Sequence, residues 1–416
     1  MIKKSTTFCV APWFQIRNEN NLSKKVCCVI KELPSDKTSN NLTPLEYLNS
    51  PDIIELKSQL SAGKMPSACD TCWRDEENNI HSLRKMLNGI LTDGDPDSPN
   101  WTDSYFKNKK DYTSEMILMA DVKMGNTCNH ACVMCNPEDS SLIYTDWVKR
   151  KDSVFVKEYT NKYPNYFDNV KLSGFKNTQY REYINFTINN NKHLKYLKLL
   201  GGEPLLDNDL ITMLENLDIN IKKKLKLSLV TNGSIDIVNV LKRIGGFKHI
   251  QISVSLEGIG QVHEFARAGS NWFQLEQNIL KTLEYDAGIA LSIHHSFQSS
   301  TILGFNDLLN WCKLHSIKLS CGIVTNPEYL SIKTLPENLK QSIINSITSN
   351  RIQFITDGNT DSNLLSYDNL ILKIKNIKFD SQLHKKFFEY IDWYQSNKSI
   401  PKLETIFPEL YKYRNI

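Results

Sequence analysis

The chain has 416 residues, of which 40% are apolar and 23% charged, and its formal net charge is +4. That length allows two or three domains, and the composition is ordinary for a globular protein. The charge is spread along the chain, so it indicates neither a nucleic-acid nor a membrane partner. No apolar run approaches the ~18 residues of a membrane-spanning helix, and the first residues are too polar for a secretory signal. We therefore expect a cytoplasmic protein.

The N-terminal zone, residues 1–95, is rich in cysteine and has few long apolar runs. In a reducing cytosol, clustered cysteines indicate metal binding or catalysis rather than disulfide bonds. We therefore expect a cysteine-rich domain here. The next stretch is rich in Asp, Pro, Ser and Lys, which predicts a linker over 96–115. The ten cysteines of the whole chain are Cys9, Cys27, Cys28, Cys69, Cys72, Cys128, Cys132, Cys135, Cys312 and Cys321.

The middle zone, residues 116–326, alternates short apolar runs with amphipathic stretches. This alternation predicts a parallel sheet with crossover helices. Six strands are too few for a complete barrel, so we predict an α/β fold with a partial (β/α)6 TIM-type barrel. The predicted strands are 116–122, 196–200, 226–230, 249–256, 290–297 and 317–324. The predicted helices lie near 180–192, 207–219, 234–244, 272–285 and 304–315. Residues 327–416 are expected to form a helical C-terminal cap.

Three cysteines follow the first strand of this predicted barrel. Cys128, Cys132 and Cys135 are spaced C-x3-C-x2-C just beyond its C-terminal end, where parallel barrels form their active sites. Three thiolates on one loop can hold three irons of a [4Fe–4S] cluster and leave the fourth iron open. The spacing differs from the paired C-x2-C knuckles of zinc sites. Zinc binding and simple buried thiols are the alternative interpretations.

A second motif follows the second predicted strand, where Gly201, Gly202, Glu203 and Pro204 are consecutive. C-x3-C-x2-C after a first strand and Gly-Gly-Glu-Pro after the second together resemble the radical S-adenosylmethionine (SAM) superfamily. The resemblance covers residues 116–326. It implies a [4Fe–4S] cluster at which SAM is cleaved reductively to a 5′-deoxyadenosyl radical, which then abstracts hydrogen from a substrate C–H bond.

The resemblance also implies which residues meet SAM. The backbone of Gly201 and Gly202 and the acid of Glu203 would meet the methionyl amine, because only a bare glycine backbone approaches a ligand so closely. Arg267 would pair with the methionyl carboxylate. Met134 stands where the family often has an aromatic residue near the adenine. Further contacts are expected at the ends of the third and fourth strands, from Asn232, Ser253, Ser255 and Glu257.

The N-terminal cysteines follow a pattern that suits a second metal site. Cys69 and Cys72 form a C-x2-C pair, and Cys9 with either Cys27 or Cys28 would complete a four-thiolate shell. The pattern resembles the SPASM-related auxiliary-cluster "twitch" module of radical SAM enzymes, although that module normally follows the barrel. The resemblance favours Cys27 and implies an auxiliary [4Fe–4S] cluster that relays an electron. Structural zinc and no metal are the alternatives.

The sequence predicts a class of chemistry rather than one substrate. We expect an oxidoreductase, an epimerase or a bond-forming enzyme that acts on a peptide or a small polar substrate. Its expected protein partner is a one-electron donor such as flavodoxin or ferredoxin. Cys321, on the last predicted strand, is a candidate hydrogen donor or else a packing thiol. The alternatives for the whole chain are a carbohydrate or aminocyclitol dehydrogenase or epimerase of the same superfamily, and a zinc-binding interaction protein with a non-catalytic barrel.

Overall fold

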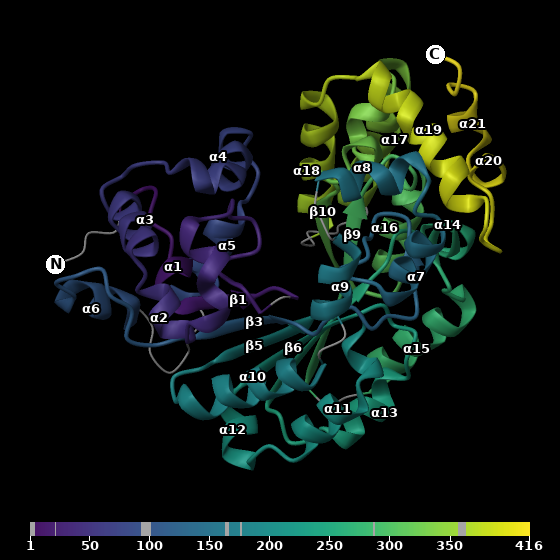
Figure 1. Cartoon of the computed structure of the whole chain (residues 1–416). Coiled ribbons are helices and arrows are strands. Elements are labelled where there is room, and N and C mark those ends of the chain that lie inside the picture. The colour runs from purple at the N-terminus through teal and green to yellow at the C-terminus, as the bar shows by residue number, and fades with distance from the viewer. Residues whose placement is uncertain are drawn as a thin grey trace.

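The centre of the molecule is a mostly parallel sheet (Figure 1). The structure is a computed structural model of the whole chain, and it describes residues 5–20, 22–92, 101–162, 166–174, 177–285, 288–356 and 363–416. Within these ranges the sheet has eight strands in the order β10-β9-β7-β6-β5-β3-β1-β2, and β2 alone is antiparallel to its neighbour. The strands are β1 (Gln15–Asn18), β2 (Lys24–Lys25), β3 (Met119–Lys123), β5 (Tyr196–Leu200), β6 (Lys226–Thr231), β7 (His249–Ser255), β9 (Ile289–Phe297) and β10 (Lys318–Ile323). A separate antiparallel pair joins β4 (Ala131–Cys132) to β8 (Arg267–Ala268).

The six strands predicted within residues 116–326 all form, with ends no more than three residues from the predicted ones. Each pairs in parallel with its neighbours, so the α/β fold with a mostly parallel sheet is confirmed. The six-stranded partial barrel and the domain boundaries stay predictions. The helices between these strands are α10 (Asn177–Asn190), α11 (Asn208–Glu215), α12 (Ile219–Lys224), α13 (Ile237–Arg243), α14 (Gly260–Ala266), α15 (Trp272–Glu284) and α16 (Phe305–Leu314).

Side-chain alternation gives the sheet two different faces. In β7, Ile250, Ile252 and Val254 are buried, whereas Gln251 and Ser253 are exposed or partly exposed. A period of two sends these two sets to opposite faces. The apolar face packs against α10 to α13, which lie below the strands in Figure 1. The polar face is therefore left free to line a site.

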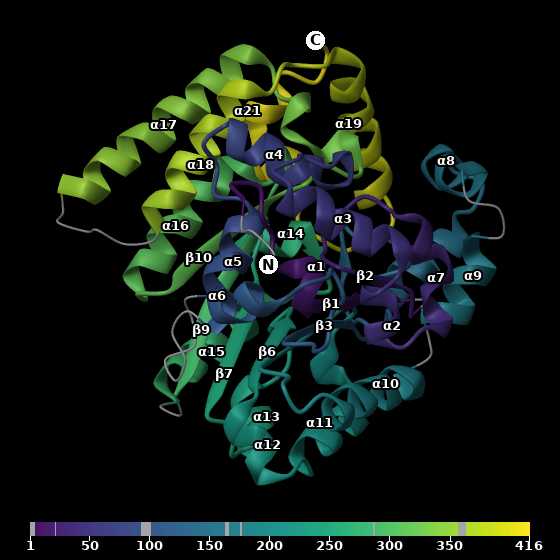
Figure 2. The ribbon, with the colours of Figure 1, turned by 90° about the vertical axis from the view of Figure 1, so that its left-hand side faces the viewer.

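The N-terminal segment is joined to this sheet rather than separate from it. β1 runs parallel to β3, with Ile16 opposite Ala120 and Arg17 opposite Asp121. The sequence did not predict β1 because its four residues are all buried and show no alternation. The helices of this segment lie in front of β1 and β3 in Figure 2. They are α1 (Ala11–Phe14), α2 (Pro44–Leu48), α3 (Pro51–Ser61), α4 (Asp70–Glu77) and α5 (Leu83–Thr92).

Part of the predicted linker folds as the helix α6 (Trp101–Asn108), while residues 96–100 lie outside the described residues. Phe106 on this helix is buried, and its ring centroid lies 5.0 Å from those of Phe8 and Trp13. The sequence did not predict α6, because the residues around Phe106 are mostly polar and are typical of a linker. The contact ties α6 to the N-terminal segment, because large aromatic side chains bury the most apolar area.

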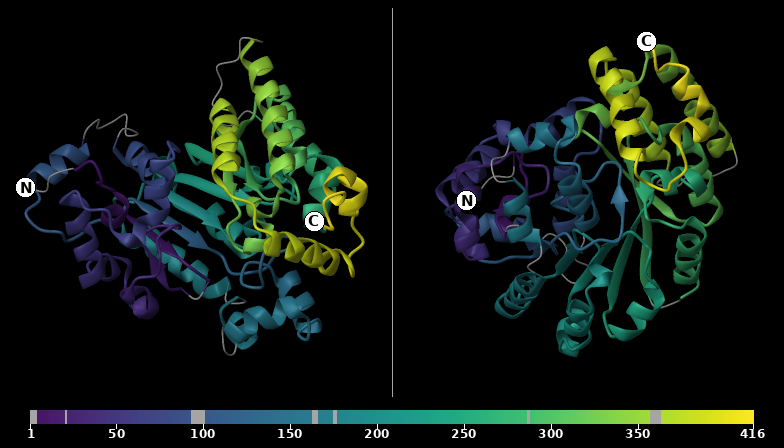
Figure 3. Two further views of the ribbon diagram at one scale, coloured as in Figure 1. Left: turned by 90° about the horizontal axis from the view of Figure 1, so that it is seen from above. Right: turned by 45° about the vertical axis from the view of Figure 1, so that its right-hand side comes forward.

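The C-terminal part of the chain is helical. Figure 3 shows the sheet between the N-terminal helices and these C-terminal ones. Within the described residues, no helix is both long and apolar enough to cross a membrane. The longer helices are α17 (Glu337–Thr356), α18 (Asn363–Asn376) and α19 (Ser381–Gln395), and the short α20 (Leu403–Ile406) and α21 (Pro408–Tyr411) follow. Three helices, α7 (Ser141–Lys149), α8 (Val154–Lys162) and α9 (Tyr166–Gly174), precede α10.

The packing of α6 predicts a large effect of truncating its buried ring. We expect Phe106→Ala to destabilise the protein by about 3–5 kcal/mol, because it leaves a cavity among three aromatic side chains. The measurement is the thermal unfolding midpoint by circular dichroism. Phe273→Ala is the matched control, since Phe273 is 71% exposed. Equal midpoints for the two variants would show that α6 contributes nothing to stability.

Candidate functional site

Three thiols come together on the loop after β3. Cys132 is buried, and Cys128 and Cys135 are half-buried. Burial raises the pKa of each thiol, that of Cys128 to about 12, and the charge of Cys132 raises the pKa of the other two further. The three side chains are thus close enough to interact electrostatically. Three neighbouring thiols match the protein ligands of one iron–sulfur cluster.

Hydrogen-bond donors face the sulfur atoms of this loop. The His130 N–H donates to Cys128 Sγ at 3.4 Å, and Asn232 Nδ2 lies 3.9 Å from the same atom. Arg267 Nη1 lies 3.7 Å from Cys132 Sγ. Donors and a guanidinium favour the thiolate over the thiol, and the thiolate is the form that binds iron. The donor set therefore fits a [4Fe–4S] cluster held by these cysteines.

The Gly-Gly-Glu-Pro turn after β5 packs directly on this loop. Gly202 has a φ of +52°, and a Cβ on it would lie 2.4 Å from the Thr127 carbonyl oxygen. The N–H of Glu203 donates to that same oxygen at 2.7 Å. A side chain at position 202 would therefore push the turn off the loop. The sequence analysis explained Gly202 by the close approach of a ligand. In the structure, the contact of this residue with the Thr127 backbone already requires a glycine.

The Glu203 carboxylate accepts hydrogen bonds from three groups of the protein. It is buried and accepts from the Thr231 hydroxyl at 2.8 Å, from the Asn232 N–H at 2.5 Å and from the Leu205 N–H at 3.1 Å. These bonds tie the turn, which continues through the buried Pro204, to the end of β6. Contact of this acid with a methionyl amine would have to compete with these three donors.

Arg267 and Glu257 form a buried ion pair beside the thiols. Arg267 Nη2 lies 2.7 Å from Glu257 Oε1, and Glu257 Oε2 accepts from the Ser296 N–H at 3.1 Å. Burial lowers the pKa of Arg267, but Cys132 and Glu257 outweigh burial and raise it, so the guanidinium stays charged. Its Nε–H is buried and has no hydrogen-bond partner among the described residues. This free donor fits the predicted contact with a carboxylate.

The predicted serines of β7 lie on the polar face of the sheet. Ser253 and Ser255 are partly exposed, and Ser255 is opposite His294 of β9. Burial lowers the pKa of His294 to about 4, and the charge of Lys198 on β5 is among the smaller influences on it. Lys198 is itself half-buried, and its ammonium makes no hydrogen bond or ion pair within the described part of the chain. Sequence reasoning did not single out Lys198.

Cys321 lies on the other face of the sheet. It is opposite His295 in register, and His295 is fully buried against the rings of Phe297 and Phe305. The structure therefore does not bring Cys321 to the face that carries the two serines. Met134 lies next to Cys135 on the wall of a small cavity.

Four of the five N-terminal cysteines line one cavity. Burial raises the pKa of all four thiols, and the charge of a neighbouring cysteine raises it further for three of them. The four are Cys9, Cys27, Cys69 and Cys72. Cys28 lies elsewhere: after burial, the charges of Arg17, Asp121 and Lys198 have the largest influence on its pKa. The structure thus groups Cys27, and not Cys28, with the other three.

Neither cysteine group is arranged around a single ion. Within the ranges that the structure describes, no three Cys, His, Asp or Glu side chains form a group that could hold one metal ion. A [4Fe–4S] cluster takes each thiolate on a different iron, whereas a tetrahedral zinc ion binds all its sulfur ligands at about 2.3 Å.

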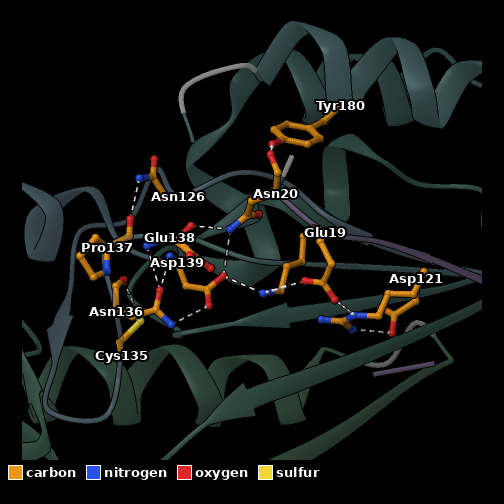
Figure 4. Close-up of polar contacts among 12 residues, drawn as sticks. Glu19, Asn20, Asp121, Asn126, Cys135, Asn136, Pro137, Glu138, Asp139 and Tyr180 are labelled. Atoms are coloured by element: carbon orange, nitrogen blue, oxygen red, sulfur yellow. Dashed lines mark hydrogen bonds and ion pairs between the residues drawn. The ribbon is translucent and has the colours of Figure 1, made fainter. Parts of the chain in front are cut away.

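A chain of charged side chains, buried at Arg17 and Asp121 and partly exposed at the others, connects the N-terminal segment to the cysteine loop (Figure 4). Arg17 bonds Asp121 at 2.9 Å and Glu19 at 2.7 Å. Lys123 lies 3.1 Å from Glu19 and 3.0 Å from Asp139, which is four residues after Cys135. The chain was missed from sequence, although two charged residues inside the apolar strand β3 were a signal.

Backbone and amide contacts complete this connection. Asn20 Nδ2 donates to Asp139 Oδ1 at 3.1 Å and to the Glu138 carbonyl, while its own carbonyl accepts from the Tyr180 hydroxyl. Asn136 Oδ1 accepts from the Glu138 N–H at 2.8 Å. The segment after Cys135 is thus fastened to the end of β1, and Figure 4 shows Cys135 at one end of the network.

Comparisons with known proteins give partial likenesses. No family model matches the chain. A protein named probable GTP 3′,8-cyclase, from Methanococcus aeolicus, is 28% identical over 161 residues, which are 37% of this chain and 50% of the relative. The chain therefore spans about half the length of the curated relative that it matches.

Solved structures are similar only in part. Native anSMEcpe with bound AdoMet shares 17% identity at a TM-score of 0.38, over 58% of this chain and 62% of that one. Streptococcus suis SuiB bound to the precursor peptide SuiA shares 13% identity at a TM-score of 0.39, over 68% and 60%. Likenesses of this size are too weak to establish a shared fold or function.

The contact of Gly202 with Thr127 predicts the effect of a single added carbon. We expect Gly202→Ala to destabilise the protein by about 2 kcal/mol or more, because the residue is in the left-handed region and its Cβ would overlap a carbonyl. The thermal unfolding midpoint measures this. Gly89→Ala is the control, since Gly89 lies in α5 with no atom within 4 Å of an added Cβ; it should be neutral or slightly stabilising.

The chain of charged residues from Arg17 to Asp139 predicts that the stability of the protein depends on pH in acid. Burial raises the pKa of Glu19, but Lys123 and Arg17 outweigh burial and lower it to about 2. The stabilisation from ionised Glu19 is therefore complete above about pH 4.5 and is lost as the pH falls toward 2. In urea unfolding of the metal-free protein, Glu19→Gln should be less stable than the parent by about 2 kcal/mol at pH 6 and nearly equal to it near pH 2. A constant difference at both pH values would contradict this, and the exposed Glu284→Gln is the control.

Proposed function

We propose that the chain is a radical SAM enzyme with an auxiliary cluster. The observation that carries the proposal is the meeting of the C-x3-C-x2-C loop with the Gly-Gly-Glu-Pro turn through Gly202 and Thr127. Both motifs sit at carboxyl ends of parallel strands, where α/β proteins place their sites. The partial match to a probable GTP 3′,8-cyclase supports the superfamily assignment.

In this proposal Cys128, Cys132 and Cys135 would hold a [4Fe–4S] cluster, beside which SAM would bind. The chemistry that the cluster and SAM would supply there is radical abstraction of hydrogen from a substrate C–H bond. The chain orients the cofactor: the free Nε–H of Arg267 is available to the methionyl carboxylate. The hydroxyls of Ser253 and Ser255 lie on the polar face, available to the ribose.

The substrate in this proposal is a peptide or a small polar molecule on the polar face of the sheet. Lys198, His294 and the serines of β7 give that face hydrogen-bond donors and acceptors, and the Lys198 ammonium has no hydrogen-bond or ion-pair partner among the described residues. Such a surface fits a polar substrate, because a few placed polar groups fix orientation in a binding site.

The auxiliary [4Fe–4S] cluster in this proposal is held by Cys9, Cys27, Cys69 and Cys72. Four protein thiolates leave no iron open for substrate, so the site serves electron relay to or from the substrate radical. Arg84 lines the same cavity, where burial raises the pKa of Cys9, Cys69 and Cys72 and the charge of Arg84 offsets a small part of that rise. A flavodoxin or ferredoxin is the proposed source of the reducing electron.

Metal analysis tests the proposal. The parent, reconstituted without oxygen, should contain about eight irons and eight sulfides per chain, since each of two clusters holds four. The triple variant Cys128→Ala, Cys132→Ala, Cys135→Ala should retain about four. Parent protein with SAM and a reductant should release 5′-deoxyadenosine, and the triple variant should not. Iron absent from the parent would end the proposal, and zinc without sulfide would favour an interaction protein.

Neighbouring cysteines provide a matched pair for the auxiliary site. We expect Cys27→Ser to lose about four irons per chain and Cys28→Ser to lose none, because only Cys27 lines the shared cavity. Both substitutions change one sulfur to oxygen, so any general effect on folding is shared. The measurement is iron and sulfide per chain with the electron paramagnetic resonance (EPR) signal of each cluster. Loss of iron in the Cys28 variant alone would reverse the assignment.

A further inference from the structure

Two tyrosines of the C-terminal helix α19 bond to the backbone of the cysteine loop. Tyr394 Oη donates to the Ala131 carbonyl at 2.8 Å, and Tyr390 Oη donates to the Val133 carbonyl at 2.8 Å. These two acceptors are the residues immediately before and after Cys132. Residues more than 250 positions apart in sequence therefore meet at the central cysteine of the motif.

The tyrosines complete a row of bonded carbonyls. The His130 carbonyl accepts from Ser140 Oγ at 2.6 Å, and the Cys132 carbonyl accepts from the Cys135 N–H at 3.1 Å. Together with the two tyrosine bonds, four consecutive carbonyls, those of residues 130–133, are held by donors of the protein. Buried backbone groups need such partners, and the partners chosen fix the orientation of each peptide. The loop geometry is thus set before any metal binds.

The Tyr390 hydroxyl bonds to this loop, and the Tyr394 hydroxyl lies closer to the Ala131 carbonyl, at 2.8 Å, than to its second acceptor, the Phe265 carbonyl, at 3.2 Å. Tyr390 and Tyr394 are four residues apart, so they lie on one face of α19, and both are buried. Burial raises the pKa of each, followed by the charge of Cys135 for Tyr390 and of Cys132 for Tyr394. The two hydroxyls therefore remain protonated donors at neutral pH.

The helix that carries these hydroxyls is itself fixed at its start. The Asp380 side chain caps it by accepting from the Gln382 and Leu383 N–H groups at 3.0 Å. The two ring nitrogens of His384 lie 2.6 Å from the Thr334 carbonyl and 2.7 Å from the Tyr413 carbonyl, so the ring can donate to either of them. A capped and anchored helix presents its side chains in a fixed place.

We propose that Tyr390 and Tyr394 are positioning residues that hold the cysteine loop in its cluster-binding geometry. This inference rests on the proposed function. The hydroxyls act on the peptides at either side of Cys132 rather than on a thiol or on SAM. A bonded carbonyl polarises its own peptide unit, so the same bonds influence the electrostatic surroundings of the cluster, which set its reduction potential.

The test compares Tyr390→Phe, Tyr394→Phe and the double variant with the parent. Phenylalanine keeps the ring packing and removes only the hydroxyl. In metal-free protein, hydrogen exchange of amides 130–136 should become about tenfold faster in each single variant and about a hundredfold faster in the double variant, since one buried hydrogen bond is worth about a factor of ten. Tyr367→Phe is the matched control, because the buried Tyr367 donates to Asn350 Oδ1, far from this loop in sequence, at 2.9 Å.

A second measurement uses the loaded protein. The midpoint potential and EPR signal of the cluster at Cys128, Cys132 and Cys135 should shift in the double variant, while those of the N-terminal cluster stay unchanged. Unchanged exchange at 130–136, or faster exchange throughout the chain, would overturn the proposal. A parent without iron at this loop would end the proposed function, whereas exchange in metal-free protein would still decide the role of the tyrosines.

Discussion

The close approach of Gly202 to Thr127 is the constraint on which the rest of the candidate site depends. A carbonyl oxygen 2.4 Å from the place of an absent Cβ leaves no freedom for the turn after β5. Because the turn is fixed, the Glu203 side chain can reach Thr231 and Asn232 and tie β5 to β6. The loop that carries the three cysteines therefore packs against a turn whose position is fixed.

Charged side chains that are buried or only partly exposed flank this loop on two sides, and in each case they are paired. Arg267 with Glu257 lies beside Cys132, and the chain from Arg17 to Asp139 lies beyond Cys135. An isolated buried charge costs several kcal/mol, which explains why these residues occur as connected sets. The guanidinium of Arg267 also lies 3.7 Å from Cys132 Sγ. A positive charge at that place opposes the effect of burial and favours the thiolate form of this cysteine.

The sequence predicted the six strands within residues 116–326 well, because each of them is a distinct apolar run and amphipathic helices lie between them. The spacing of Cys128, Cys132 and Cys135 indicated a shared site, and the three thiols do lie close together, while their role as iron ligands stays a prediction. The sequence analysis missed β1, whose four buried residues carry no alternation, and α6, whose buried Phe106 lies in a polar stretch. It could not place Cys321 on a face of the sheet, since that depends on the register with β9. Long-range hydrogen bonds such as those of Tyr390 leave no local signal at all.

The cysteine loop is held by both ends of the chain. Asn20, at the end of β1, bonds Asp139 and the Glu138 carbonyl, and the tyrosines of α19 bond the carbonyls on either side of Cys132. A middle segment without these ends would leave buried carbonyls unpaired, at a cost of about 1–3 kcal/mol each. The three zones recognised in the sequence therefore differ in composition yet form one structural unit around the loop. The cysteine-rich segment precedes the sheet in sequence but contacts the cysteine loop. It does so because its strand β1 lies beside β3, the strand that leads into that loop.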